Sequence, residues 1–198
     1  SALHVLGKSS LFGNGEAAIE WGDNAALGSL SFSGVAGNPI VRANTGKDLV
    51  FQTNGGNTRL TIDSGAGFKF SNSSLTEKVK ITAGKLSDNQ NINLDNGMVH
   101  YFTTTETTTS TPNITASAGI NTIMSTGDTM VVTLITTAAA GAYSAQLTIE
   151  GAATTENWIG GEVPAAGGAS GVDIYSYTII KTGSAAYTVI GNLSKTST

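Results

Sequence analysis

LVFQTNGGNTRLTID, residues 49–63, carries the strongest fold signal in the chain. Apolar and polar residues alternate on both sides of Asn54-Gly55-Gly56-Asn57, and these four residues tolerate the positive φ angles that tight turns need. The stretch therefore predicts a β-hairpin with one apolar and one polar face.

The same period-two alternation continues through the first hundred residues in short runs. Isolated ribbons of such short strands are marginally stable in water, because each offers only one apolar stripe. We therefore expect this part to form a trimeric shaft, in which identical chains around a symmetry axis supply the missing apolar face. The residues expected to pack at the trimer axis are Phe51, Leu60, Ile62, Phe68, Phe70, Met98 and His100.

Composition limits the functions open to the chain. Among 198 residues there is no Cys, and 12% are charged, against about 25% in an average soluble domain. The lack of Cys excludes disulfides and thiolate sites. Ten Lys plus Arg against fourteen Asp plus Glu disfavour a nucleic-acid partner. No apolar run is long enough to predict insertion into a membrane.

Charge and composition divide the sequence near residue 102. Residues 1–100 carry eight acidic and eight basic residues, whereas residues 101–198 carry six acidic and two basic ones. Residues 103–112 are a Thr-rich stretch that ends in Pro112, which is typical of an extended linker or an edge segment. We therefore expect a fibre shaft or attachment region at 1–102, a linker at 103–112 and a head domain at 113–198.

The expected head contains β-rich runs separated by Gly-containing turns. This spacing favours an antiparallel β-sandwich, jelly-roll-like in arrangement. The expected fold class is therefore all-β, an extended intertwined shaft followed by a sandwich head. The runs are Ile120–Met124, Thr129–Thr137, Tyr143–Ile149, Ile174–Thr182 and Ala186–Leu193.

Motifs that would indicate catalysis are missing. No Ser has Gly at both −2 and +2, and neither a phosphate loop nor a dinucleotide fingerprint occurs. The Asn-rich run at 88–97 fits solvent-facing strand positions better than a calcium loop. The acids at 150, 156, 162 and 173 leave a glycosidase pair open, although surface acids are the simpler interpretation. We expect no enzyme, no cofactor and no metal site.

The long Gly-rich segment at residues 157–171 is the most favourable place for contact with a partner. Trp158 at its start either plugs one end of the sandwich or presents a stacking surface for a sugar or a partner. The candidate receptor or partner contacts are Trp158, Glu162 and Asp173.

Two sets of residues resemble virion proteins. Gly46–Gly55 followed by Thr58–Gly65 resembles the repeated DLVF-TNG-RLTID-G segments of bacteriophage tail-fibre proteins, and Leu27–Phe32 resembles their upstream strand. Trp158–Gly161, with Gly171–Tyr175 and Tyr187–Asn192, is similar to a terminal module of structural proteins from marine and cyanobacterial phages.

The resemblance implies a virion component on the exterior of the tail or capsid. Its expected role is host-surface attachment as a homotrimeric tail fibre or capsid-attached fibre. The implied partners are other copies of the chain, other virion proteins and a host receptor, with a glycan as one candidate. A decoration or cement protein that stabilises the particle is the alternative, and a polysaccharide-cleaving tailspike is a further one. The opening Ser1-Ala2-Leu3, without Met, predicts a piece of a longer chain.

Overall fold

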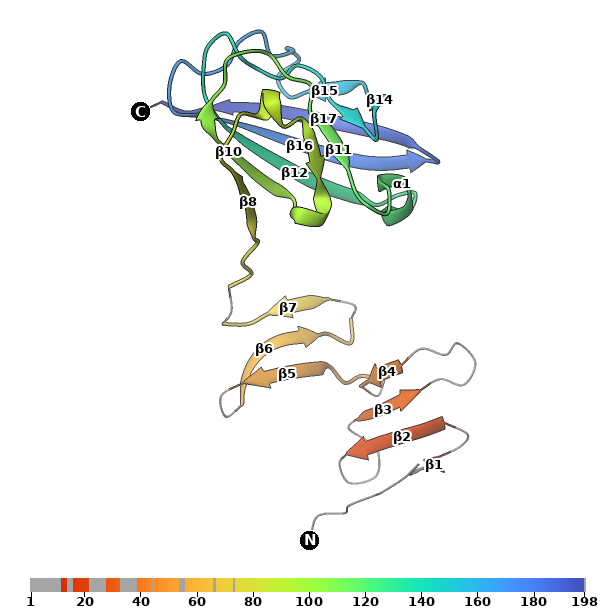
Figure 1. Ribbon diagram of the computed structural model, residues 1–198. Helices are drawn as coiled ribbons and strands as arrows, with labels where there is room; N and C mark the ends of the chain where they lie inside the picture. The colour runs from red at the N-terminus through yellow and green to blue at the C-terminus, as the bar shows by residue number, and fades with distance from the viewer. Residues whose placement is uncertain are drawn as a thin grey trace. The chain divides into compact units, whose positions relative to one another are not determined.

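The computed structural model describes residues 12–13, 16–21, 28–32, 39–43, 45–53, 56–65, 67–72 and 74–197, with side chains described from Val41 onward except Arg42. Nearly all of the regular structure is β, which confirms the predicted all-β class (Figure 1). The chain divides into two compact units, Ser1–Thr76 and Glu77–Thr198. None of the described helices has the length and hydropathy that a bilayer crossing needs.

The first unit contains two antiparallel sheets, each formed by strands in sequence order. One sheet consists of β1 (Phe12–Gly13), β2 (Glu16–Trp21), β3 (Gly28–Phe32) and β4 (Pro39–Arg42). The other consists of β5 (Leu49–Thr53), β6 (Asn57–Ile62) and β7 (Phe68–Phe70). The β5–β6 pair confirms the predicted hairpin, although Asn54 and Gly55 of its turn lie outside the described residues.

The second unit contains a six-stranded and a four-stranded sheet. The larger has the order β15-β17-β16-β12-β10-β8 and the smaller the order β14-β13-β11-β9. The larger sheet is formed by β8 (Val79–Thr82), β10 (Val99–Thr105), β12 (Thr129–Thr137), β15 (Glu156–Trp158), β16 (Val172–Gly183) and β17 (Ala186–Lys195). The smaller is formed by β9 (Asn91–Asn93), β11 (Asn113–Thr115), β13 (Thr148–Ile149) and β14 (Ala152–Ala153). Short helical turns lie at η1 (Leu86–Asp88), η2 (Leu94–Asn96) and α1 (Ile120–Ile123).

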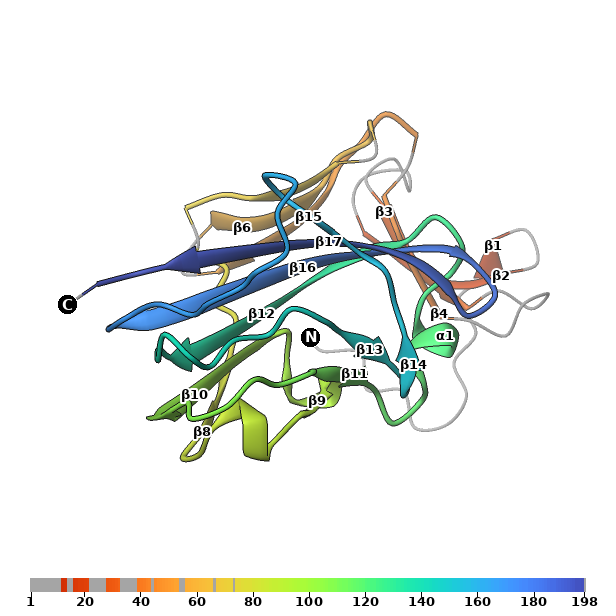
Figure 2. The ribbon, with the colours of Figure 1, turned by 90° about the horizontal axis from the view of Figure 1, so that it is seen from above.

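From β8 to β13 the chain alternates between the two sheets (Figures 1 and 2). Between two neighbouring strands of one sheet, the chain passes through a strand of the other sheet and so completes one turn of a coil. The later strand of each such pair therefore runs parallel to the earlier one. Accordingly β8, β10 and β12 pair in parallel, as do β9, β11 and β13. The expected antiparallel order holds for β12–β16 and β16–β17 but not for these strands.

A single cluster of buried side chains from both sheets forms the core of the second unit. Alternate residues of β12 and β16 point inward, which places Leu134, Tyr175 and Tyr177 in the cluster. Ile92 of β9, Ile114 of β11 and Ile149 of β13 contribute from the smaller sheet. The pleat of each strand thus sends alternate side chains into the core.

The expected boundary near residue 102 differs from the division in the structure, which falls between Thr76 and Glu77. Strand β10 pairs with β8 and β12 on its two sides, so residues 79–105 belong to the second unit. The Thr-rich stretch at 103–112 also lies inside this unit. Its Glu106 is buried and accepts hydrogen bonds from Leu86 N at 2.5 Å and Ser87 N at 3.2 Å.

One predicted strand is helical. Ile120–Met124 was expected to be extended, but Ile120–Ile123 forms α1. The cause is a contact distant in sequence, because the Glu150 carboxylate accepts hydrogen bonds from Ala116 N at 3.2 Å and Ile120 N at 3.0 Å. The bond from Ile120 satisfies one of the backbone N–H groups that a helix start leaves without partners, and the bond from Ala116 fixes the segment before it.

Candidate functional site

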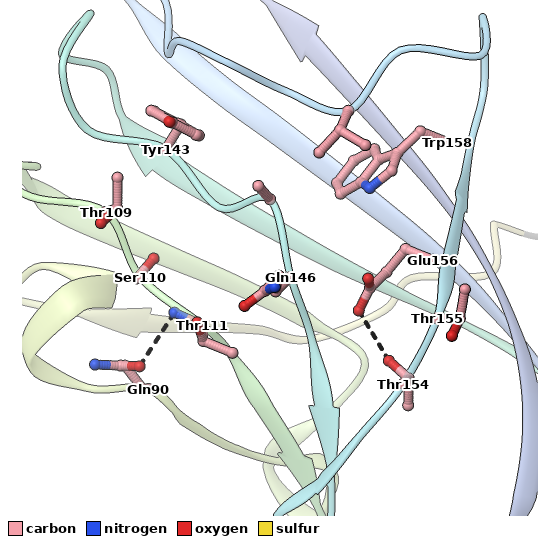
Figure 3. A pocket seen from close by; sticks show the side chains of 12 residues that line it. Gln90, Thr109, Ser110, Thr111, Tyr143, Gln146, Thr154, Thr155, Glu156 and Trp158 are labelled. Carbon is pink, nitrogen blue, oxygen red and sulfur yellow. Dashed lines mark hydrogen bonds between the residues drawn. The ribbon is translucent and has the colours of Figure 1, made fainter.

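A groove of about 620 Å³ lies in the second unit. Trp158 and Glu156 of β15 form one wall, and the segments around Ser110 and Tyr143 form the opposite one (Figure 3). The groove is lined by Gln90, Thr109, Ser110, Thr111, Tyr143, Ala145, Gln146, Thr154, Thr155, Glu156, Trp158 and Val163.

Packing against two neighbours holds the indole of Trp158 in place. Its ring meets Tyr177 edge to face, with centroids 6.0 Å apart and an interplanar angle of 69°. Strand β17 passes close to the indole at Gly191, where an added Cβ would lie 3.0 Å from Cε3 and Cζ3 of the ring. The glycine thus gives the indole room beside β17, and Trp158 lines the groove.

Hydrogen bonds fix the Glu156 carboxylate on the same wall. Its Oε1 accepts from Leu147 N at 2.6 Å and from Thr154 Oγ1 at 2.9 Å (Figure 3). These bonds join the start of β15 to the chain segment that leads into β13. The carboxylate is thereby held in one orientation, with its second oxygen left for other contacts.

The opposite wall is tied to the core through two serines. Ser110 Oγ lies 2.7 Å from Ser144 Oγ, and Ser144 N donates to the Tyr175 hydroxyl at 3.1 Å. Burial raises the pKa of Tyr175 to about 12, so this hydroxyl stays neutral over the physiological range. Gln90 Oε1 accepts from Thr111 N at 3.1 Å and holds the remainder of this wall (Figure 3).

The predicted contact residues separate in the structure. Trp158 lines the groove, and Glu162 is exposed in the following loop. Asp173 is fully buried, and both of its carboxylate oxygens accept from Gly168 N, at 2.9 and 3.0 Å. The prediction of a surface contact at Asp173 does not fit this burial, because its carboxylate holds the loop at Gly168 from the protein interior.

The predicted axis residues fall in both units. Phe51, Leu60 and Phe70 face one another across β5, β6 and β7, and Ile62 pairs with Phe68 on the same face. Phe51 is 46%, Phe68 73% and Phe70 50% exposed, so the described residues leave this apolar face largely uncovered.

Met98 and His100 do not join this face, because they belong to the second unit. Met98 is half-buried against its core, and His100 lies on the inner face of β10. His100 Nε2 lies 3.0 Å from Gly97 O, and burial lowers the pKa of the imidazole. The ring is thus a neutral side chain packed within the unit, which does not fit the expected place at a trimer axis.

A second surface was missed by sequence reasoning, the outer face of the six-stranded sheet. Strand register places residues from β8, β10, β12, β16 and β17 on this face, and none of the positions assigned to it is charged. Ile81 is 64% and Val131 50% exposed. The face consists of Val79, Ile81, Val99, Tyr101, Val131, Thr133, Ile135, Ile174, Ser176, Thr178, Ile180, Thr188, Ile190 and Asn192. We call it the outer sheet face.

Three of the four acids considered as a possible glycosidase pair hold backbone N–H groups, whereas Glu162 is exposed. Glu150 holds the start of α1, Glu156 holds Leu147, and Asp173 holds Gly168. No group of three or more His, Asp or Glu that could bind a metal occurs among the described residues. Comparison with models of protein families, with curated proteins and with solved structures finds no match to the chain.

Proposed function

We propose that the chain is a structural component of a phage virion, a homotrimeric fibre whose second unit contacts the host surface. The observation that carries this proposal is the pair of uncovered apolar faces, one in each unit. The β5–β7 face leaves three Phe side chains about half exposed or more, and the outer sheet face is uncharged across five strands. Monomeric proteins rarely leave such patches open to water.

A second copy of the chain is the occupant that fits these faces best. The chain carries a net charge of −4, so identical copies repel one another unless the contacts avoid charged positions. The charged residues of β12, β16 and β17 that are buried, Asp173 and Lys181, point to the inner side. The outer sheet face therefore meets its own copy without burying an unpaired charge.

A fibre works through shape and contact, and the arrangement of the acids supports this. Three of the candidate carboxylates, those of Glu150, Glu156 and Asp173, accept hydrogen bonds from backbone N–H groups, and Glu156 among them lines the groove. Groups fixed in this way pre-organise a binding surface, because little side-chain freedom remains to be lost on contact. We therefore assign host contact to the groove and self-association to the two apolar faces.

The proposal is tested by locating the chain. An antibody against residues 77–198, applied to lysates of the source culture, is expected to co-sediment with particles and to label projections from the tail or capsid in electron micrographs. Uniform labelling of the capsid shell would instead favour a decoration protein. Recovery of the chain only in the particle-free fraction would contradict a virion role.

A further inference from the structure

The lining of the groove defines the kind of ligand that it can hold. Lys and Arg are missing from the residues that line it, so an anionic ligand would find no counter-charge there. A single carboxylate, Glu156, is too little for a divalent cation, which takes six or more oxygen ligands in the case of calcium. The remaining polar groups are hydroxyls and amides, so the groove suits a neutral ligand rich in hydrogen-bonding groups.

Several of these hydroxyls and amides are available to form hydrogen bonds with a ligand. In the part of the chain that the structure describes, the side chains of Gln146, Thr109 and Thr155 make no hydrogen bond with other residues. The amide of Gln146 both donates and accepts, as each hydroxyl does. A polyhydroxylated ligand offers the same mixture of donors and acceptors. When such a ligand displaces water from the groove, its hydroxyls can form the hydrogen bonds that the water made with these side chains.

Aromatic side chains add an apolar element on each wall. Trp158 and Tyr143 lie on opposite sides of the groove (Figure 3). Trp and Tyr combine an apolar ring with one polar group, so they suit a ligand that is apolar on one side and hydrated on the other. The C–H face of a sugar ring has this character, with its hydroxyls directed around the rim. The volume of about 620 Å³ lies in the range of small-ligand pockets and exceeds what one sugar ring fills.

We propose that the groove binds a short neutral glycan, with Trp158 and Tyr143 as its apolar walls and Gln146, Thr155 and Glu156 as hydrogen-bonding groups. This inference rests on the proposed function, because it names the class of receptor that the fibre contacts. It adds Tyr143, Gln146 and Thr155, which sequence reasoning did not select. The held carboxylate of Glu156 accepts from a sugar hydroxyl through its second oxygen, which strengthens that bond.

A matched pair of Thr substitutions tests the site. The full chain is applied to an array of immobilised neutral gluco-, galacto- and manno-oligosaccharides, with sialylated and sulfated oligosaccharides beside them. We expect binding to a neutral member, weakened about 5-fold by T155A because one hydrogen bond is lost. T182A removes the same atoms from an exposed position at the far end of β16 and should bind like the parent.

Tryptophan fluorescence gives a second readout that does not depend on immobilisation. The chain has two Trp residues, so W21F leaves Trp158 as the only indole. Titration of this variant with the neutral oligosaccharide selected on the array should change the Trp158 emission, with saturation at the concentration that saturates the array. The sialylated oligosaccharide should leave the emission unchanged.

Three results would overturn the inference: binding to none of the neutral glycans, binding only to sialylated or sulfated ones, or equal affinity of T155A and T182A. These results leave the proposed function standing if the chain is still found on particle projections. Absence from particles together with neutral glycan binding would overturn the proposed function and keep the groove assignment.

Discussion

At the scale of single residues, buried charged groups in the second unit are held by backbone atoms. Lys181 Nζ donates to Asn121 O at 2.6 Å and Met124 O at 2.7 Å, which closes the end of α1. Glu106 and Asp173 accept from backbone N–H groups in the same manner. Lys181 and Asp173 lie near the two ends of β16, so their contacts join this strand to α1 and to the loop at Gly168. Glu106 in turn holds the start of η1.

Asp173 provides a direct test of this arrangement. Asp173→Ala leaves Gly168 N, a buried donor, without its carboxylate, at an expected loss of about 1–3 kcal/mol in the free energy of unfolding. Urea unfolding followed by near-UV circular dichroism measures the change.

Asp88→Ala is the matched control for this substitution. Asp88 is exposed and makes a surface ion pair with Lys85 at 3.2 Å, which contributes about 0–1 kcal/mol. Equal losses for the two variants would contradict an anchoring role for Asp173.

His100 should make stability depend on pH. Burial and the nearby charge of Lys80 lower the pKa of its imidazole, so the folded state binds a proton less readily than the unfolded state. The free energy of unfolding should therefore fall as the pH drops below 6.5, toward the folded-state pKa.

His100→Gln keeps a donor for Gly97 O and removes the titrating group. Between pH 7.5 and 5.5 the melting temperature of the parent should fall more than that of the variant, as measured by calorimetry. The same pH dependence in both proteins would show that other groups cause the loss.

Residue-scale predictions from the sequence were limited by what alternation can reveal. The place of Trp158 in a long Gly-rich segment predicted either a plug at the sandwich end or a contact surface, but alternation could not show that Asp173 lies on the inner face of a strand. Asp173 precedes Ile174, an apolar residue on the outer sheet face, so hydropathy alone suggests the opposite orientation. Only the partner, Gly168 N, explains a buried carboxylate at this position.

At the scale of elements, close packing of β15 on β17 positions the groove wall. Asn157 pairs with Ile190 and Trp158 with Gly191, in a parallel ladder at the edge of the larger sheet. The indole therefore depends on a neighbouring strand that does not itself line the groove.

Gly191→Ala tests this dependence. The new Cβ would lie 3.0 Å from two indole carbons, so the ring must move by a few tenths of an ångström. We expect the affinity for the neutral oligosaccharide to fall by about 3- to 10-fold, as for loss of a contact of about 1 kcal/mol. Isothermal titration calorimetry measures this change.

Gly183→Ala is the control, because the added Cβ meets only Ala186 Cβ at an ordinary 3.6 Å. Its affinity should equal that of the parent. Unchanged affinity in Gly191→Ala would show that the position of the indole does not matter for binding.

The elements that sequence reasoning predicted are those with long alternation. Strand β12 matches the predicted Thr129–Thr137, and β16 and β17 extend the predicted runs by a few residues. Parallel pairing of β8, β10 and β12 could not be predicted, because alternation is the same in parallel and antiparallel strands. Short segments such as α1 depend on distant contacts and were missed for that reason.

At the scale of the whole molecule, uncovered apolar faces are the feature that most requires explanation. Full burial of a Phe or Val side chain contributes about 1.5–3 kcal/mol. The exposed Phe68, Ile81 and Val131 would therefore add to the stability of the folded chain if a partner buried them. The short strands of the first hundred residues, each with one apolar stripe, predicted association. The location of the outer sheet face required the strand register.

Analytical ultracentrifugation of the full chain tests the central claim, self-association through uncharged sheet faces. The parent is expected to sediment as a trimer, three times the chain mass of 20.1 kDa. Val131→Lys places a charge on the outer sheet face and should shift the protein to monomer. Val163→Lys, at a similarly exposed Val in the loop, should remain a trimer. A monomeric parent, or identical sedimentation of the two Lys variants, would contradict the account.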